Sequence, residues 1–155
     1  MANEVLVVRK PLVWMAPAAT PTTFAAIENF VKKITIKPKR GKIDVRNYAT
    51  EGNKNEKGDP EHEVEIEFFH SRSYTDFTSL LITELNADDP THFRVKYRGA
   101  VATSGTNGIW QFAVQFTDLG SLGGEKNTAS MLSVTLPIEG KIKFSTDGTT
   151  FNDLV

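Results

Sequence analysis

The residues best placed to do chemistry are three glutamates at alternate positions of the stretch HEVEIEFF, Glu63, Glu65 and Glu67. Alternate residues of a β-strand share one face, where neighbours lie about 6.6 Å apart. Two carboxylates at roughly that separation can hydrolyse a glycosidic bond by acid–base catalysis. That chemistry also needs an apolar pocket or aromatic platform that separates the two pKa values, and the surrounding sequence supplies neither.

Two structural explanations remain for these glutamates. In the first, they form a cross-strand ion-pair ladder with Arg94, Lys96 and Arg98, or with the lysines of residues 32–42. In the second, the row is unpaired, its carboxylates repel one another, and it marks a surface that must stay negative.

Other residue types that carry chemistry are scarce. His62 and His70 lie roughly 26 Å apart on an extended strand, too far to share a metal, and nothing in the spacing joins His92 to them. The chain has no cysteine and no Gly-x-Ser-x-Gly motif. The glycine-rich GSLGGEKN does not match a phosphate-binding loop, because Lys126 follows Glu125 and Asn127 replaces the Ser/Thr. We therefore expect no enzyme, catalytic residue, metal or cofactor.

Composition indicates an ordinary globular protein. The 155 residues are 39% hydrophobic and 24% charged, with a net charge of -1, which favours a single domain and argues against whole-surface binding to nucleic acid. The first ten residues do not form a signal peptide, and no apolar run approaches the roughly 20 residues of a membrane helix. We expect a chain made in a reducing cytosol, with no membrane partner.

Hydrophobic periodicity predicts a β-rich domain with one helix. Apolar residues alternate with polar ones in residues 63–69, 93–101, 109–117 and 131–144, and more briefly in 30–37 and 43–45. Between them, Tyr74, Phe77, Leu80, Leu81 and Leu85 recur at helical spacing after a capping box of Ser73 and Asp76. The expected fold is mainly β (α+β), a β-sandwich or small barrel with one flanking α-helix.

A proline-rich arm, about residues 9–29, precedes these strands. Pro11, Pro17 and Pro21 argue against a regular central strand, yet the arm holds four consecutive apolar residues, Leu12, Val13, Trp14 and Met15. Either this segment folds onto the chain's own core, or it is an apolar arm that docks on a neighbouring subunit.

Two polar stretches follow the arm. The most basic stretch holds Lys32, Lys33, Lys37, Lys39, Arg40 and Lys42, and it is either a solvated face or a groove for phosphate. The second stretch, about residues 47–61, is polar and long for a hairpin loop. It is either a surface loop or a segment that becomes ordered against another subunit.

The order of these segments resembles the tail-tube (major tail) proteins of long-tailed bacteriophages. The resemblance covers most of the chain: the polar loop leads through a strand into the helix SYTDFTSLLITEL, the aromatic strand IWQFAVQFTDLG follows, and SMLSVTLPIEGKIKF comes near the end. No single motif within it is sharp.

The resemblance implies a virion protein of the phage tail, assembled in the host bacterial cytoplasm. Copies would form hexameric rings with sheets joined between subunits, and the rings would stack into a hollow tube. DNA would pass through it without tight binding, and tape-measure and terminator proteins would be further partners.

On this interpretation, each group of candidate residues receives a role. Glu63, Glu65 and Glu67 would face the lumen. Inter-subunit contacts would fall to Lys32, Lys33, Lys37, Lys39, Arg40, Leu12, Val13, Trp14 and Met15. Contacts between stacked rings would fall to Tyr48, Asn53, Lys54, Glu56, Lys57 and Asp59.

Two alternatives belong to other classes. One is another virion component, such as a tail terminator or capsid decoration protein, which would form a single ring or a trimer. The other is a carbohydrate- or ligand-binding β-sandwich, in which Trp14 and Trp110 would stack on a sugar, although Trp110 shares its strand face with core residues.

Overall fold

The computed structural model describes residues 11–44, 55–69, 77–97, 108–120, 131–146 and 149–153. Seven strands follow one another across the main sheet, and an eighth, β10 (Asn152–Asp153), pairs with β9. Their spatial order is β2 (Ala25–Ala26), β1 (Leu12–Ala16), β7 (Thr91–Lys96), β8 (Ile109–Val114), β9 (Met131–Ser145), β6 (Glu63–Phe69) and β3 (Val31–Lys37). A separate two-stranded sheet joins β4 (Arg40–Asp44) to β5 (Asn55–Pro60).

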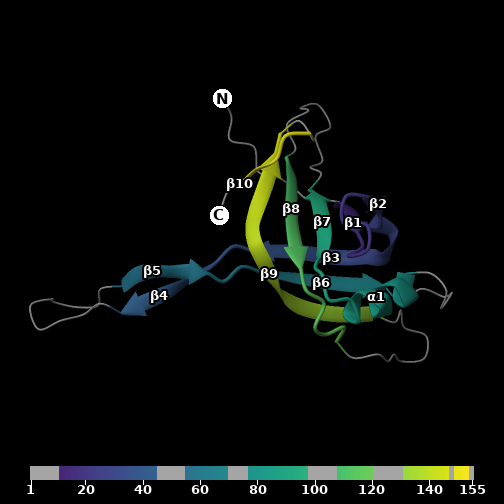
Figure 1. Ribbon diagram of the computed structural model, residues 1–155, viewed down its shortest axis with the longest axis horizontal. Coiled ribbons are helices and arrows are strands. Elements are labelled where there is room, and N and C mark those ends of the chain that lie inside the picture. Colours follow the sequence, from purple (N-terminus) through teal and green to yellow (C-terminus); the bar gives the residue numbers. More distant parts are fainter. Residues whose placement is uncertain are drawn as a thin grey trace, which may run out of the picture.

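The long strand β9 folds the main sheet into two layers (Figure 1). Its residues up to Pro137 pair with β6, and its residues from Ile138 onward pair with β8. The register with β8 shifts where Gly140 adopts a φ of 68°, a left-handed conformation that glycine adopts without strain. Such a bulge bends a strand and strengthens its twist, so one strand serves both layers.

The predicted β-sandwich with one flanking helix is confirmed. The main sheet does not close into a barrel, because β2 and β3 stand at opposite ends of the described strand order. The predicted hairpin of residues 93–101 and 109–117 is also present, as the antiparallel pair β7 and β8.

The core lies between the two layers and follows the predicted alternation. Val64, Ile66 and Phe68 on β6 are each 0% exposed, and the intervening glutamates are only half-buried. Burying each such apolar side chain stabilises the fold by about 1.5–3 kcal/mol. The other strands contribute their inward-facing apolar residues, among them Ile34, Phe93, Val95, Phe112, Val114, Leu132, Val134, Leu136 and Ile142.

The helix α1 (Phe77–Leu85) packs beside the end of β6. The Phe77 ring stacks on Phe30 of the short 3-10 helix η1 (Glu28–Phe30), with centroids 4.7 Å apart, and lies 5.4 Å from the Phe68 ring. Leu81 is fully buried, whereas Leu85 is 37% exposed and ends the apolar stripe. Tyr74 and the capping pair Ser73 and Asp76 lie outside the described residues.

A buried carboxylate fixes the other end of α1. Glu84 is 3% exposed, and its Oε2 accepts a hydrogen bond from the backbone N–H of Ala18 at 3.0 Å and another from the Thr91 hydroxyl. Thr91 is itself buried at the start of β7. One side chain therefore joins the helix, the connection after β1 and the first residue of β7.

Two expectations about the arm and the polar loop need correction. Residues 12–16 form the regular strand β1 between β2 and β7, because Pro11 precedes the strand and Pro17 follows it, so neither proline interrupts the ladder. Val13 and Met15 are core residues, 0% and 1% exposed, so the interpretation that this stretch folds onto the chain's own core holds for them. In the predicted polar loop, residues 55–60 form strand β5, paired with β4.

We predict that Glu84→Ala destabilises the chain by about 1–3 kcal/mol, because the half-buried N–H of Ala18 and the buried hydroxyl of Thr91 lose their acceptor. Urea unfolding followed by circular dichroism measures this loss. Glu56→Ala, a truncation at an exposed glutamate of β5, is the matched control and should change the free energy of unfolding by less than about 0.5 kcal/mol. Equal effects of the two variants would contradict the role of Glu84.

Candidate functional site

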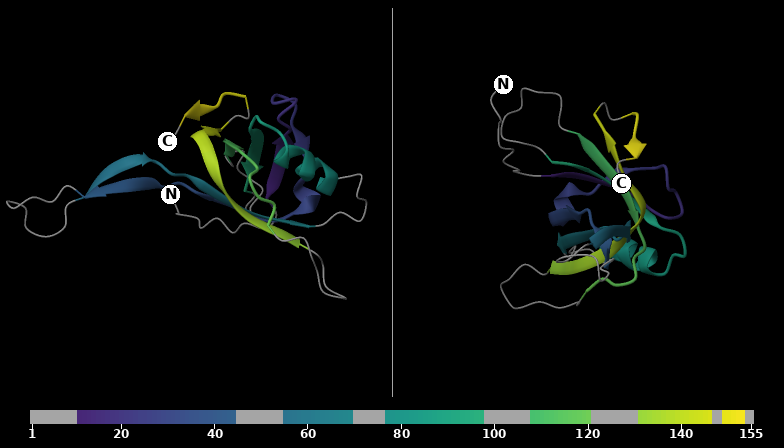
Figure 2. Two further views of the ribbon diagram at one scale, coloured as in Figure 1. Left: turned by 60° about the horizontal axis from the view of Figure 1, so that its bottom comes forward. Right: turned by 90° about the vertical axis from the view of Figure 1, so that its left-hand side faces the viewer.

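The hairpin of β4 and β5 extends away from the body of the molecule (Figures 1 and 2). Among the described strands, β4 and β5 pair only with each other. Every described residue of the hairpin is exposed except the half-buried Gly41 and Gly58. Ile43 is 51% exposed, an unusual position for a large aliphatic side chain. Two-stranded hairpins without a packed face are marginally stable in water, so this one needs a second surface to become rigid.

A buried histidine holds the base of the hairpin. His62 is 2% exposed, and its Nδ1 accepts a hydrogen bond from the backbone N–H of Lys39 at 2.9 Å. The N–H of Glu61 donates to the carbonyl of Lys39, and the N–H of Ile138 donates to the carbonyl of His62, each at 2.8 Å. These bonds join the first residues of the hairpin to β6 and β9.

The bond to Lys39 requires a neutral imidazole with its proton on Nε2, because only an unprotonated Nδ1 accepts. That Nε2 is buried and has no hydrogen-bond partner among the described residues. Sequence reasoning considered His62 as a metal ligand, rejected that role, and did not find this junction. The available signal was parity: His62 shares the inward face of Val64 and Ile66.

The three glutamates of β6 lie opposite two lysines and a threonine of β3. In the β3–β6 register, Lys37 is opposite Glu63, Thr35 opposite Glu65 and Lys33 opposite Glu67. The Glu65 carboxylate lies 3.1 Å from the Lys37 Nζ and 3.9 Å from the Lys33 Nζ. The predicted ladder is therefore present at Glu65, formed with lysines of the basic stretch and not with Arg94 or Lys96 of β7.

We predict that the Glu65 carboxyl titrates below its ordinary pKa of 4.5, because a hydrogen bond from Lys37 and the charges of Lys33 and Lys37 stabilise the carboxylate. Since the folded pKa is lowered, the stabilisation is present above about 4.5 and is lost as pH falls through the folded pKa. Lys37→Gln should raise that pKa in an NMR titration of the side-chain carboxyl. Lys32→Gln, outside the ion pairs of Glu65, should leave it unchanged; an equal shift would contradict the ladder.

The outer face of β7 carries an arginine held between two aromatic rings. The Arg94 guanidinium lies 4.0 Å from the Phe24 ring centroid and 4.5 Å from that of Phe151, and its Nε donates to Gln111 at 3.0 Å. Cation–π contacts of this kind contribute about 0.5–1 kcal/mol at exposed sites. These two contacts hold the segment between β1 and β2 and the segment before β10 against the outer face of β7.

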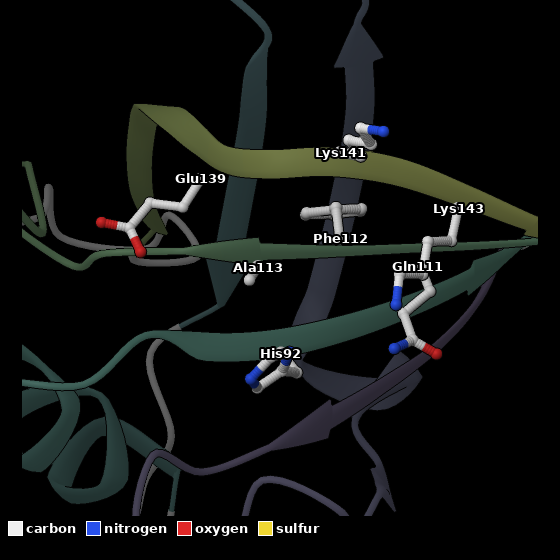
Figure 3. A pocket seen from close by; sticks show the side chains of 7 residues that line it. All are labelled: His92, Gln111, Phe112, Ala113, Glu139, Lys141 and Lys143. Carbon is white, nitrogen blue, oxygen red and sulfur yellow. The ribbon is translucent and has the colours of Figure 1, made fainter. Parts of the chain in front are cut away.

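Beside this cluster, the β9 bulge leaves a cavity of about 200 Å³ (Figure 3). Its lining combines imidazole, carboxylate, amide and ammonium groups with apolar atoms, from His92, Gln111, Phe112, Ala113, Glu139, Lys141 and Lys143. Neither Trp14 nor Trp110 lines it, and Trp110 instead packs on Phe144 with ring centroids 4.7 Å apart. The cavity therefore lacks both tryptophans that were predicted to stack on a sugar.

Within the described residues, no group of three or more His, Asp or Glu side chains is arranged to hold a metal ion. No described helix has the length and apolar character needed to cross a membrane.

We predict that burial and the nearby Lys143 charge lower the pKa of His92 below its ordinary value of 6.5. As pH falls below about 6.5, the unfolded chain takes up this proton first, so the proton uptake destabilises the fold. In an NMR titration of the imidazole, Lys143→Gln should raise the pKa. Lys141→Gln is the control, since Lys141 pairs with Asp153 at 3.7 Å, and it should have the smaller effect.

The structure places the other predicted site residues as follows. Leu12 and Trp14 are half-buried on β1, while Lys32, Lys33, Lys37, Lys39 and Arg40 are exposed on or beside β3 and β4. Glu56, Lys57 and Asp59 lie on β5 of the protruding hairpin. Tyr48, Asn53 and Lys54 lie outside the described residues.

Comparison with known proteins adds one finding. No protein-family model matches the sequence, and no curated protein matches it. Among solved structures, the chain is similar to a chain of the anti-feeding prophage (AFP) baseplate, a cryo-EM structure with 6-fold symmetry applied. The TM-score is 0.59 at 11% identity, and the match covers 94% of this chain and 97% of that chain. The likeness is one of fold.

Proposed function

We propose that this chain is a structural virion protein that assembles with copies of itself into stacked rings, forming a hollow tail tube through which DNA passes. The observation that carries the proposal is the β4–β5 hairpin, which extends from the body and pairs with no other described strand. The resemblance of the sequence to tail-tube proteins supports it. So does the fold shared, nearly end to end, with a chain of a prophage baseplate.

Contacts between stacked rings fall to the hairpin in this proposal. Glu56, Lys57 and Asp59 present charges along β5, and Tyr48, Asn53 and Lys54 belong to the segment between its strands. Ile43 supplies an apolar contact on β4. Covering its exposed part on a neighbouring copy would contribute on the order of 1 kcal/mol.

Contacts within a ring fall to β3 and β1. β3 is the last strand of the described order, and Lys32, Lys33 and Lys37 are exposed on it, with Lys39 and Arg40 just beyond. Leu12 and Trp14 are the residues of the apolar stretch that keep exposed surface. Lumen exposure of Glu63, Glu65 and Glu67 remains part of the proposal, with the lysines of β3 offsetting part of their charge.

The proposal places the chain in the virion tail, assembled in a bacterial cytoplasm, with tape-measure and terminator proteins as neighbours. A ring-forming tail terminator or a capsid decoration protein differs in stopping at one ring or a trimer. No observation favours a carbohydrate-binding module, since the cavity of about 200 Å³ falls below the ~300 Å³ of ordinary ligand pockets and no tryptophan lines it.

We predict that the purified chain forms hollow tubes or stacked rings at high concentration in negative-stain microscopy. Ile43→Ser should raise the concentration needed for stacking about fivefold, because the hairpin loses its apolar contact. Leu85→Ser is the matched control, because Leu85 is the other large exposed apolar side chain among the described residues, and it should assemble like the parent chain. A monomer at all concentrations, shown by light scattering, would contradict the proposal.

A further inference from the structure

The outer edge of β3 is one end of the main sheet, so its backbone groups face no further described strand. In an antiparallel pair, successive residues alternate between bonding to the partner strand and pointing away from it. An edge of seven residues with outward N–H and C=O groups is a template for an added strand.

A tyrosine side chain occupies the middle of this edge. The Tyr97 hydroxyl donates a hydrogen bond to the backbone carbonyl of Ile34 at 2.9 Å. Burial raises the pKa of Tyr97 to about 12, and a backbone hydrogen bond from Ile36 acts in the opposite direction. The hydroxyl thus bonds to the carbonyl of Ile34, and we infer that it also lies within reach of the N–H of Ile36, two residues further along.

These two groups face away from β6. A backbone N–H points in one direction, so the Ile36 N–H that faces Tyr97 does not take part in the ladder with β6. Thr35 is paired with Glu65 and Lys37 with Glu63, and by the same alternation we infer that their amides point toward β6. A strand added to β3 would need the Ile34 carbonyl and the Ile36 N–H, the pair that Tyr97 holds.

Tyr97 reaches this position from the other layer. It directly follows β7, in the layer opposite β3, and its half-buried ring packs against the core. The backbone of an added strand could replace the hydroxyl in both hydrogen bonds. The number of hydrogen bonds at the edge would then stay the same, so the exchange would cost little.

We propose that Tyr97 closes the β3 edge in the free chain, and that the extended strand of a second copy must displace it before the sheets of two copies can join. The inference rests on the self-assembly proposed above. In addition, it assigns to the Tyr97 side chain the role of slowing the association of free copies.

The test compares Tyr97→Phe with the parent chain in two measurements. Residue-resolved amide exchange of the dilute chain should show the Ile36 amide exchanging at least about fivefold faster in the variant, with Thr35 and Lys37 unchanged. Light scattering at assembling concentrations should show faster growth for the variant. Val114→Ala, a core truncation on β8, controls for a general loss of stability. It should neither speed the exchange of the Ile36 amide relative to those of Thr35 and Lys37 nor speed the growth of assemblies.

The outcomes separate the two proposals. Unchanged Ile36 exchange would overturn the closure by Tyr97, and faster exchange with unchanged or slower growth would overturn its gating of assembly. If no chain, parent included, forms assemblies at any concentration, the proposed function fails and so does gating, while the exchange data still decide whether Tyr97 covers the edge.

Discussion

Backbone hydrogen-bonding groups that have no strand partner among the described residues are the constraint on which the rest of the structure depends. Buried or structured N–H and C=O groups need partners, and a sheet that does not close leaves a row of them at each end. Among the described strands, β3 forms one such end, and the β4–β5 hairpin forms a separate two-stranded sheet whose residues are nearly all exposed. The body of the molecule, by contrast, is a well-filled sandwich.

The two-layered body of the molecule positions these incomplete elements. β9 belongs to both layers because of its bulge at Gly140, so a single strand connects them. The buried Glu84 fixes the helix against the start of β7, and the buried His62 fixes the base of the hairpin. Polar groups buried in this way are costly unless satisfied, and each of them here sets the position of a neighbouring segment.

Sequence patterns predicted the strands of the core well because a half-buried strand imposes period two. The alternation in residues 63–69 and 131–144 corresponds to β6 and β9, and the helical spacing around Phe77 and Leu81 corresponds to α1. The resemblance to tail-tube proteins agrees with the fold. Periodicity also indicated the Glu65 ladder, although two sets of basic partners fitted equally well before the register was known.

The remaining features depend on contacts between distant residues. Prolines suggested an irregular arm, yet they flank β1 without interrupting it, and Val13 and Met15 complete the core. A polar composition concealed β5, because a strand that buries nothing has no hydrophobic period to detect. The junction at His62 and the Tyr97 contact with β3 join residues 23 and 63 positions apart, and no local pattern announces either.

Hydrogen exchange across the hairpin, followed by mass spectrometry from dilute to concentrated protein, tests the central claim most directly. If the hairpin is completed only by other copies, amides of residues 40–44 and 55–59 should exchange rapidly in dilute solution and become protected as the protein associates. The amides of β6 and β9 should stay protected throughout. Strong protection of the hairpin in the dilute monomer, or none at any concentration, would contradict the claim.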